Sequence, residues 1–431
     1  MAKTVMIGAG SGFGKRMIVD LMSYPELQDG TLALVDINAA ALEAVTEFGE
    51  RVVELHEAPA KVEASTERRE VLKGADYVIV AISVGGQAYS GEPYYSEVMI
   101  PKQYGVEQSV ADTVGVGGVF RTLRTAPVML DICRDMEELC PDALLINYTN
   151  PMAMLTWIMS EATGIDNVGL CHSVQGTAGQ LAGYIGAPRE EVTYWVAGIN
   201  HMSWFLELEW KGQDAYPLLN EAMEDPEVYA KDPVRFEIMR HFDYFVTEST
   251  RHMSEYVPYF RKRPELLEEF NLPTREPAKE AKAGRWEWQD EKDRVEQLEN
   301  INLKPSGEYA SHIIQAIETG EPFRFNGNVM NEGIIGNLPA GCCVEVPCLT
   351  DASGINPCHV GELPPQLAAL NAANVAVQEL TVWAVLERDL HPAYQACLLD
   401  PLTASVCSLA EIRSMFDELV QAEGELLGYY A

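Results

Sequence analysis

Short apolar runs alternate with amphipathic stretches through the first 200 residues of the chain. Each segment begins with nearly continuous apolar residues, and most of the segments end in glycine or polar residues. The segments are TVMIGAG (4–10), TLALVDI (31–37), YVIVAISVGG (77–86), ALLINYTNP (143–151) and NVGLC (167–171). The stretches between them, such as KRMIVDLM (15–22), have helical periodicity. Continuously apolar strands separated by helices are typical of a parallel sheet covered on both faces. The pattern predicts an α/β fold with a Rossmann-like, doubly wound parallel sheet.

The pattern changes after about residue 190. EVTYWVAGINHMSWFLELEWKG (191–212) indicates two strands that meet at Asn200-His201, and CCVEVPCLTDASG (342–354) indicates another. The highly charged stretch 262–300 is typical of helix with exposed linkers, and 365–425 is mostly helical in pattern. We therefore expect two parts, a dinucleotide-binding domain over 1–195 and an integrated α+β domain for substrate binding and oligomerisation over 196–431.

Composition narrows the classes of partner. The chain has 31 basic and 65 acidic residues, a net charge of −34, and such a surface repels nucleic acids and anionic membranes. No apolar run approaches the roughly 20 residues of a membrane span, and the N-terminus lacks a signal-peptide pattern, so we expect a cytoplasmic location. The nine cysteines include no CxxC pair, and most are expected to be reduced and buried.

A glycine-rich turn, GAGSGFG (8–14), follows the first strand and precedes a helix. Gly8 and Gly10 permit close approach to a pyrophosphate, although the position of the usual third glycine holds Phe13. Asp36, 22 residues after Gly14, suits a ribose diol and favours NAD over NADP. Alternatively, the glycines only form a turn and Asp36 caps a helix. The predicted NAD contacts are Gly8, Gly10, Ser11, Gly12, Phe13, Asp36 and Asn147.

Polar groups follow several strand ends, and ligands of such sheets bind beyond the carboxyl ends of the strands. They are Asp112 in VADTVGVGG, Asn147 and Asn150 in INYTNP, Cys171-His172 and Asn200-His201. A thiolate and an imidazole 30 residues apart, Cys171 and His201, could hold one divalent ion and leave positions for substrate oxygens. Alternatively, both are ordinary core residues.

Six motifs together resemble glycoside hydrolase family 4 along nearly the full chain. They are GAGSGFG, DTVGVGG, INYTNPMAM, GLCHSVQGT, GINHM and NGNVMNEGIIGNLPAGCCVEVPCL. The spellings CHSVQGT and GINHM are most similar to the α-galactosidase branch of that family. The resemblance implies NAD-dependent chemistry, an exception to glycoside hydrolysis by paired carboxylates.

In that family NAD⁺ removes hydride from C3 of the sugar, a base removes the C2 proton, and the glycosidic oxygen is eliminated. Water then adds and the hydride returns, while Mn²⁺ or another divalent ion stabilises the enediolate. By position, the resemblance makes Cys171 and His201 the metal ligands. It makes Asn150 a substrate ligand, to which we add Asn200 and His172. Tyr256 matches the base, with Tyr259 as its competitor.

The general acid stays open between two residues. His172 stands where phospho-glycosidase members have an aspartate, and histidine is a suitable acid near neutral pH. Asp112 is the rival, unless it orients the metal's water or a metal ligand. Nothing near Cys171 in the sequence supplies the orienting acid that a nucleophilic Cys-His pair would need.

The stretch VGGQAYSGEPYYSEVMIP (84–101) lacks the arginine that pairs the sugar phosphate in phospho-glycosidase members. We therefore expect an uncharged α-galactoside, with an α-glucoside or an α-hexuronide (a glucuronide or galacturonide) as the alternative. An NAD-dependent dehydrogenase of a hydroxy acid or sugar, and a protein that only binds NAD as a sensor, are the alternatives from other classes. The resemblance also implies a homodimer or homotetramer.

Overall fold

The computed structural model describes residues 1–85, 91–277 and 298–430. Six parallel strands form one half of its sheet, in the order β3-β2-β1-β4-β5-β6. Their bounds are β1 (Lys3–Ile7), β2 (Thr31–Val35), β3 (Lys61–Ser65), β4 (Tyr77–Val80), β5 (Leu144–Asn147) and β6 (Asn167–Gly169). This is the strand order of a dinucleotide-binding sheet, and the predicted fold class is confirmed. All five predicted strands are present.

Strand β3 was not predicted from the apolar pattern. It has the sequence KVEAS, and only Val62 and Ser65 are partly buried. β3 lies at the edge of the sheet, paired with β2 alone. An edge strand that faces solvent carries no apolar run, so periodicity could not find it.

The sheet does not stop where the parallel strands end. β10 (Phe323–Met330) pairs antiparallel with β6, and the path continues through β11 (Cys343–Asp351), β7 (Val192–Ile199), β8 (Met202–Trp210) and β9 (Gln213–Asp214). β12 (Gly354–Pro357) pairs with β11. The two strands expected over 191–212 and the strand expected over 342–354 are confirmed. The domain boundary at residue 195 stays a prediction, and it falls within β7.

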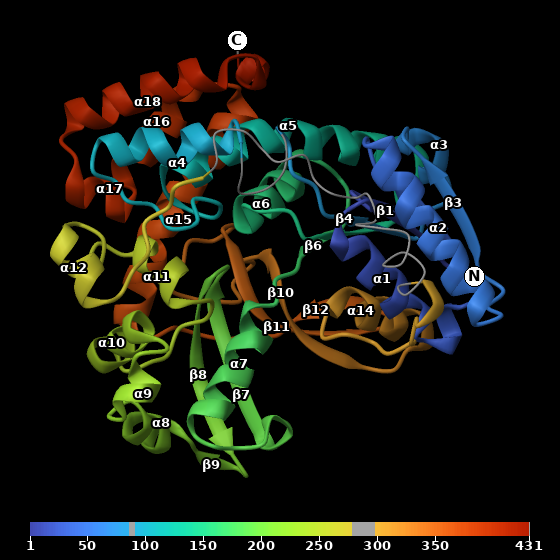
Figure 1. Cartoon of the computed structure of the whole chain (residues 1–431), viewed down its shortest axis with the longest axis horizontal. Helices are drawn as coiled ribbons and strands as arrows, with labels where there is room; N and C mark the ends of the chain where they lie inside the picture. The colour runs from blue at the N-terminus through green and yellow to red at the C-terminus, as the bar shows by residue number, and fades with distance from the viewer. Residues whose placement is uncertain (86–90, 278–297, 431) are drawn as a thin grey trace.

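Helices lie on both sides of the parallel strands, with α5 on one side and α1 and α14 on the other (Figure 1). The stretch 365–425 is helical, as predicted, whereas residues 278–297 of the charged stretch lie outside the described residues. The helices are α1 (Gly12–Met22), α2 (Ala39–Leu55), α3 (Arg68–Leu72), α4 (Tyr94–Gln103), α5 (Gly115–Leu139), α6 (Met152–Ala162), α7 (Ser173–Tyr184), α8 (Tyr216–Ala222), α9 (Pro226–Tyr229), α10 (Pro233–Phe242), α11 (Thr250–Tyr256), α12 (Pro264–Glu269), α14 (Tyr309–Thr319), α15 (Pro365–Glu387), α16 (Leu390–Leu399), α17 (Pro401–Val406) and α18 (Leu409–Glu423).

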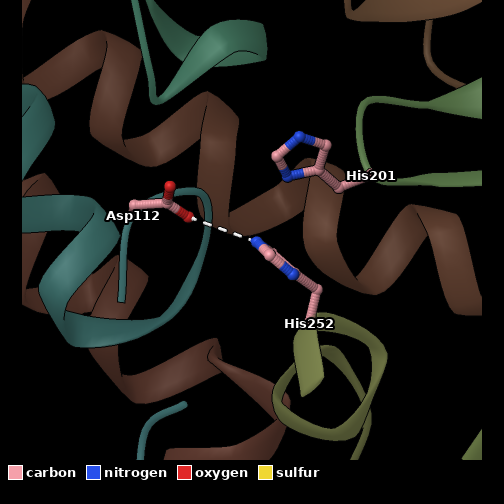
Figure 2. Close-up of side chains that lie close together, drawn as sticks. All are labelled: Asp112, His201 and His252. Atoms are coloured by element: carbon pink, nitrogen blue, oxygen red, sulfur yellow. Dashed lines mark ion pairs between the residues drawn. The ribbon is translucent and has the colours of Figure 1, made fainter. Parts of the chain in front are cut away.

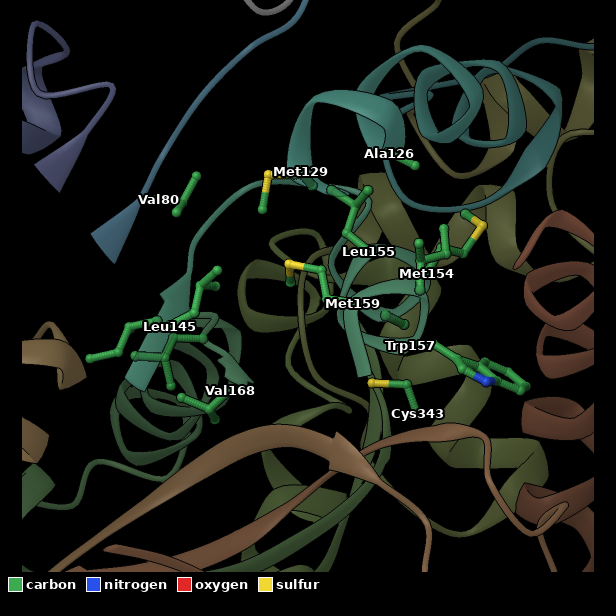
Figure 3. Close-up of a cluster of buried hydrophobic side chains, with 14 of the residues drawn as sticks. Val80, Ala126, Met129, Leu145, Met154, Leu155, Trp157, Met159, Val168 and Cys343 are labelled. Carbon is green, nitrogen blue, oxygen red and sulfur yellow. The ribbon is translucent and has the colours of Figure 1, made fainter. Parts of the chain in front are cut away.

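The core lies between the sheet and the helices α5 and α6. Figure 3 shows Val80, Leu145 and Val168 on the strands and Met129 and Met159 on these helices, all buried. None of the nine cysteines forms a disulfide, and seven of them are buried, in keeping with reduced core residues. The packing fixes the strand ends at which the predicted site residues lie.

Helix α15 is long and apolar enough to cross a membrane by length and composition. In the structure it packs against α5, α6 and α16 and buries polar side chains. Asn371 accepts a hydrogen bond from Trp204 Nε1 at 2.9 Å and donates one to the Met202 carbonyl at 2.8 Å. α15 is therefore a core helix, and it anchors the β8 end of the hairpin at Asn200-His201.

Candidate active site

Cys171 and His201 come from distant parts of the sheet and meet at one point. Cys171 lies in the turn between β6 and α7, and His201 lies in the turn between β7 and β8. The Cys171 Sγ atom is 3.1 Å from His201 Nε2, and both side chains are buried. The structure thus brings together the two residues that the sequence suggested as metal ligands.

The backbone of His201 adopts an unfavourable conformation to reach this position. Ile199 pairs with Met202, so Asn200 and His201 form a two-residue turn, and His201 has φ +61°. Glycine adopts this left-handed region most easily; among other residues asparagine, aspartate and histidine occur there most often, at a cost of about 1–3 kcal/mol. Since the anchoring of Met202 by Asn371 holds the turn in place, the fold maintains an imidazole where a glycine would be easier.

The other nitrogen of His201 faces a hydroxyl pair. Nδ1 lies 2.9 Å from Thr113 Oγ1 and 3.2 Å from the Tyr256 hydroxyl. Tyr256 ends α11 and is 1% exposed, whereas Tyr259 is 41% exposed and packs against Phe260. Of the two tyrosines proposed as the base, Tyr256 lies in the site. Burial raises its pKa well above the usual value, and Asp112 raises it further, so a nearby cation is needed to form the phenolate.

Asp112 lies beside this group and is 1% exposed. Its Oδ1 accepts a hydrogen bond from Thr113 Oγ1 at 2.9 Å, and its Oδ2 accepts one from Asn150 Nδ2 at 3.3 Å. On the other side, Asp112 Oδ1 lies 4.0 Å from Nε2 of His252 (Figure 2). The predicted residues Asp112 and Asn150 are therefore in direct contact, and Asp112 orients the Asn150 amide.

Two residues of this group, Glu248 and His252, were missed in the sequence analysis. Glu248 Oε1 lies 3.0 Å from His252 Nδ1, and Glu248 Oε2 lies 3.9 Å from His201 Nε2. The spacing Glu248, His252, Tyr256 is four residues each time, which places His252 and Tyr256 on one face of α11. This four-residue spacing, which leads up to the proposed base Tyr256, was the sequence signal that could have identified Glu248 and His252.

The donor atoms suit a divalent cation. Cys171 Sγ, a His201 nitrogen and a Glu248 carboxylate oxygen all lie within 4.8 Å of one another. A second such group, Asp112, His201 and His252, shares His201 with the first. Thiolate, imidazole and carboxylate are all donors to first-row divalent metals, so the residues present fit such an ion.

His172 lies at the entrance of α7 beside Cys171, with 69% of its side chain exposed. Its Nδ1 is 3.7 Å from Glu308 Oε1, and this carboxylate raises the pKa of His172 to about 9, an effect that solvent screens at so exposed a site. Asn200, by contrast, is 2% exposed, and neither atom of its side-chain amide has a hydrogen-bond partner in the described chain. Both ends of this buried amide are therefore available to a substrate hydroxyl or to a water molecule, and its role as a substrate ligand stays a prediction.

The glycine-rich turn has the packing that a dinucleotide site needs. Gly8 has φ +87°, and a Cβ there would lie 2.1 Å from the Ala81 carbonyl oxygen. A Cβ at Gly14 would lie 1.9 Å from the Ala9 carbonyl oxygen. Gly14 thus permits the close approach of α1 to the turn that follows β1, and Phe13 instead packs against Tyr148 with ring centroids 4.4 Å apart. This explains the departure from the usual glycine spacing.

Asp36 and the N-terminus of α1 complete the candidate dinucleotide site. Asp36 Oδ2 accepts a hydrogen bond from the Gly10 N–H at 2.9 Å, while Asn38, rather than Asp36, caps α2. No side chain caps α1, and the buried Oγ of Ser11 has no partner among the described residues. Backbone N–H groups at a helix N-terminus favour the binding of a phosphate, so this site fits a dinucleotide.

Asn147, expected to contact the cofactor, has both ends of its amide bound to backbone. Its Nδ2 donates to the Thr149 carbonyl at 3.1 Å, and its Oδ1 accepts from the Thr149 N–H at 2.8 Å. Asn147 therefore shapes the turn that presents Asn150. Its contact with NAD stays a prediction.

Comparison with known proteins gives matches to both parts of the chain. Residues 3–187 match the family described as "Family 4 glycosyl hydrolase", and residues 196–403 match "Family 4 glycosyl hydrolase C-terminal domain". An α-galactosidase of Bacillus subtilis (strain 168) is 43% identical over 100% of both chains. An α-galactosidase of Rhizobium meliloti (strain 1021) is 38% identical over 100% of this chain and 90% of its own.

A solved structure of the 6-phospho-β-glucosidase from Thermotoga maritima, with manganese, NAD⁺ and glucose-6-phosphate, has a TM-score of 0.77. It is 22% identical and covers 98% of each chain, a likeness of fold. The resemblance first indicated by six short motifs is confirmed by matches to both parts of the chain. The chain belongs to glycoside hydrolase family 4.

Proposed function

We propose that this glycosidase is an α-galactosidase that cleaves uncharged α-galactosides with NAD⁺ and a divalent cation, Mn²⁺ foremost, as cofactors. Two full-length relatives with that activity support the substrate, and the Thermotoga maritima structure with manganese and NAD⁺ supports the cofactors. The observation that carries the proposal is one line of contacts. The imidazole of His201 lies 3.1 Å from the Cys171 thiol through Nε2 and 3.2 Å from the Tyr256 hydroxyl through Nδ1. One side chain thus contacts both a candidate metal ligand, Cys171, and the candidate base, Tyr256.

When bound, NAD⁺ takes hydride from C3 of the sugar and returns it, and the cation withdraws electron density from the sugar oxygens. The glycine-rich turn and Asp36 would hold the dinucleotide. Cys171 and His201 would hold the cation. Asn150, with its amide oriented by Asp112, is placed to bind a sugar hydroxyl.

Proton transfers fall to two other residues. Once C3 is a ketone, the C2 proton is acidic, and the Tyr256 phenolate removes it. The glycosidic oxygen then leaves, and His172 protonates it, with Asp112 as the rival acid. Water then adds at C1 and gives its proton to His172, which restores the acid, and the Tyr256 phenol returns a proton to C2. No net oxidation results, so NADH does not accumulate.

The charges around the site support a neutral sugar. The carboxylates of Asp112, Glu248 and Glu308 lie near the candidate cation ligands and His172, where they disfavour an added phosphate or uronate. Of the stretch 84–101 that lacks arginine and lysine, residues 86–90 lie outside the described residues. An α-glucoside or an α-hexuronide is the alternative, and product analysis with a panel of aryl α-glycosides separates them.

The first experiment is an assay of 4-nitrophenyl α-galactoside cleavage with NAD⁺, Mn²⁺ and a thiol reductant, each omitted in turn. We expect loss of activity without NAD⁺ or metal, and no accumulation of NADH. Cleavage that persists after both are stripped contradicts the mechanism. Steady NADH production without nitrophenol would instead identify a dehydrogenase, and NAD binding without either reaction would identify a sensor.

A cytoplasmic location and a homodimer or homotetramer complete the proposal. Both follow from the family resemblance and the sequence pattern. Light scattering of the purified full chain tests the assembly, and a monomer at micromolar concentration would contradict it.

A further inference from the structure

We propose that Glu248 is a third protein ligand of the divalent cation, beside Cys171 and His201, and that His252 holds the Glu248 carboxylate in place. The inference rests on the cation site of the proposed function and extends the two ligands that the family motifs indicate. It assigns a role to a residue pair that the reaction scheme above does not use.

The three donor atoms lie on one side of the His201 ring. Nε2 of His201 is 3.1 Å from Cys171 Sγ and 3.9 Å from Glu248 Oε2. Atoms bound to one metal at about 2.0–2.3 Å lie roughly 3 to 3.5 Å from each other. The Cys171–His201 separation lies within this range, whereas Glu248 Oε2 lies outside it and within 4.8 Å of both other donor atoms, so Glu248 must move inward to bring its Oε2 into the site.

The second oxygen of the carboxylate lies beside His252. Glu248 Oε1 is 3.0 Å from Nδ1 of His252, which also contacts the Ser249 hydroxyl at 2.9 Å, and Nε2 of His252 faces Asp112 (Figure 2). If His252 Nδ1 carries its proton toward Glu248 rather than toward Ser249, this N–H would fix one oxygen of the carboxylate and direct the other to the metal. His252 therefore acts as a positioning residue, because it touches the ligand rather than the cation or the sugar.

The backbone of Glu248 is also held in an unfavourable conformation. Its φ is +74°, in the left-handed region, as for His201. Arg235, 1% exposed and paired with Asp232, donates to the Glu248 carbonyl, and Thr177 Oγ1 donates to it at 3.4 Å. Strain that a buried ion pair maintains is typical of functional positions. Two strained residues thus direct their side chains to the same point.

A carboxylate changes the character of the site. Cys171 alone offers a soft thiolate, which suits zinc and similar ions, whereas carboxylate oxygen suits Mn²⁺ and Mg²⁺. A thiolate and a carboxylate together also bring two negative charges to a dication. The competing role for Glu248 is that of a counter-charge to His252 that never touches the metal.

The test measures metal binding by the chelator-treated full chain without substrate. Calorimetry with Mn²⁺ gives the affinity, and the visible absorption spectrum at saturating Co²⁺ reports the ligand set. Glu248→Gln keeps the shape and removes the charge. Glu308→Gln is the matched control, because it removes an equal charge beside His172 without touching a donor atom of the proposed set.

We expect Glu248→Gln to weaken Mn²⁺ binding roughly 100-fold or more, above the 10–100-fold typical of a group that only orients a ligand. Glu308→Gln should weaken it less than about 3-fold, as expected for a screened charge. The Co²⁺ spectrum of Glu248→Gln should differ from that of the unchanged chain. An unchanged spectrum, or an affinity equal to that of the control, overturns the inference.

Failure of the inference differs from failure of the proposed function. If the unchanged chain binds no Mn²⁺, the cation site itself is wrong; if it binds and Glu248→Gln binds equally well, only the third ligand is wrong. Should Glu248→Gln not fold, His252→Gln replaces it. This variant should lose roughly 10-fold in Mn²⁺ affinity and keep the Co²⁺ spectrum, and an unchanged affinity overturns the positioning role.

Discussion

The Tyr256 hydroxyl lies 3.2 Å from Nδ1 of His201, the ring whose Nε2 faces Cys171. A cation at Nε2 would place the ring proton on Nδ1, because a metal-bound imidazole nitrogen carries no proton. That N–H can then donate to Tyr256 or to Thr113. A hydrogen bond to the phenolate and a nearby positive charge both favour the ionised tyrosine. Cation binding would therefore convert a phenol whose pKa is raised by burial into a base.

Tyr256→Phe tests this role. Without the hydroxyl no group accepts the C2 proton, so kcat should fall roughly 100- to 10,000-fold, the usual contribution of a general base. Mn²⁺ and NAD⁺ affinities, measured by calorimetry, should change little. Tyr259→Phe is the control, since Tyr259 is 41% exposed and lies apart from the His201 contacts. Equal activity of the two variants would remove Tyr256 from the mechanism.

The general acid can be assigned by comparing the activity of variants on substrates with good and poor leaving groups. An acid matters most when the departing alcohol is a poor leaving group, so loss of the acid should impair a natural disaccharide far more than 4-nitrophenyl α-galactoside. We expect His172→Asn to lower kcat/KM roughly 100-fold on the disaccharide and less than about 10-fold on the nitrophenyl substrate. The same comparison with Asp112→Asn decides between them. A selective loss in Asp112→Asn alone would make Asp112 the acid.

Asp36→Ala tests the dinucleotide site. The carboxylate accepts the Gly10 N–H and is placed for the ribose hydroxyls, so its loss should weaken NAD⁺ binding about 10- to 100-fold, as for hydrogen bonds to a charged group. NADP⁺ binding should improve, because the repulsion of a 2′-phosphate is removed. Fluorescence titration measures both. Glu43→Ala, on the exposed side of α2, should leave both affinities unchanged, and parallel losses in the two variants would argue against the assignment.

The buried Glu345 carboxyl should make stability depend on pH. It accepts a hydrogen bond from Ser203 Oγ at 2.9 Å, and burial raises its pKa to about 7 from an unfolded value of 4.5. Between these pH values the folded chain keeps a proton that the unfolded chain releases. Stability therefore falls as pH rises from about 4.5 to 7, by up to about 3 kcal/mol.

Glu345→Gln removes this dependence. Relative to the unchanged chain, the variant should become progressively more stable between pH 5 and pH 7.5. Urea unfolding of both metal-free proteins at a series of pH values measures the difference. A difference in unfolding free energy that stays constant over this range would show that Glu345 keeps an ordinary pKa.

The parallel half of the fold was predictable from sequence because each buried strand is a continuous apolar run. β3 was not, since its residues face solvent at an edge. The continuation of the sheet was also hidden, because Gly169 of β6 pairs with Asn328 of β10, far along the chain. Periodicity identifies strands and carries no information on which distant strands become neighbours.

The residues of the candidate site also differ in whether the sequence could predict them. Cys171, His201 and Asn150 stand at strand ends or turns, where a pattern of apolar runs exposes them. Glu248 lies just before the short helix α11 and His252 lies within it. Their contacts with His201 and Asp112 depend on where the tertiary fold places this helix. Only a spacing of four residues indicated them, and such spacing is common on ordinary helices.

In the proposed mechanism, this chain breaks the glycosidic bond by oxidation and elimination. The most direct measurement is NMR of the galactose released from an α-galactoside by the NAD⁺- and Mn²⁺-loaded enzyme in D₂O. Because the C2 proton is removed and then replaced from solvent, we expect deuterium at C2 of the product. Galactose that retains its protium at C2, released at the full rate, would contradict the mechanism.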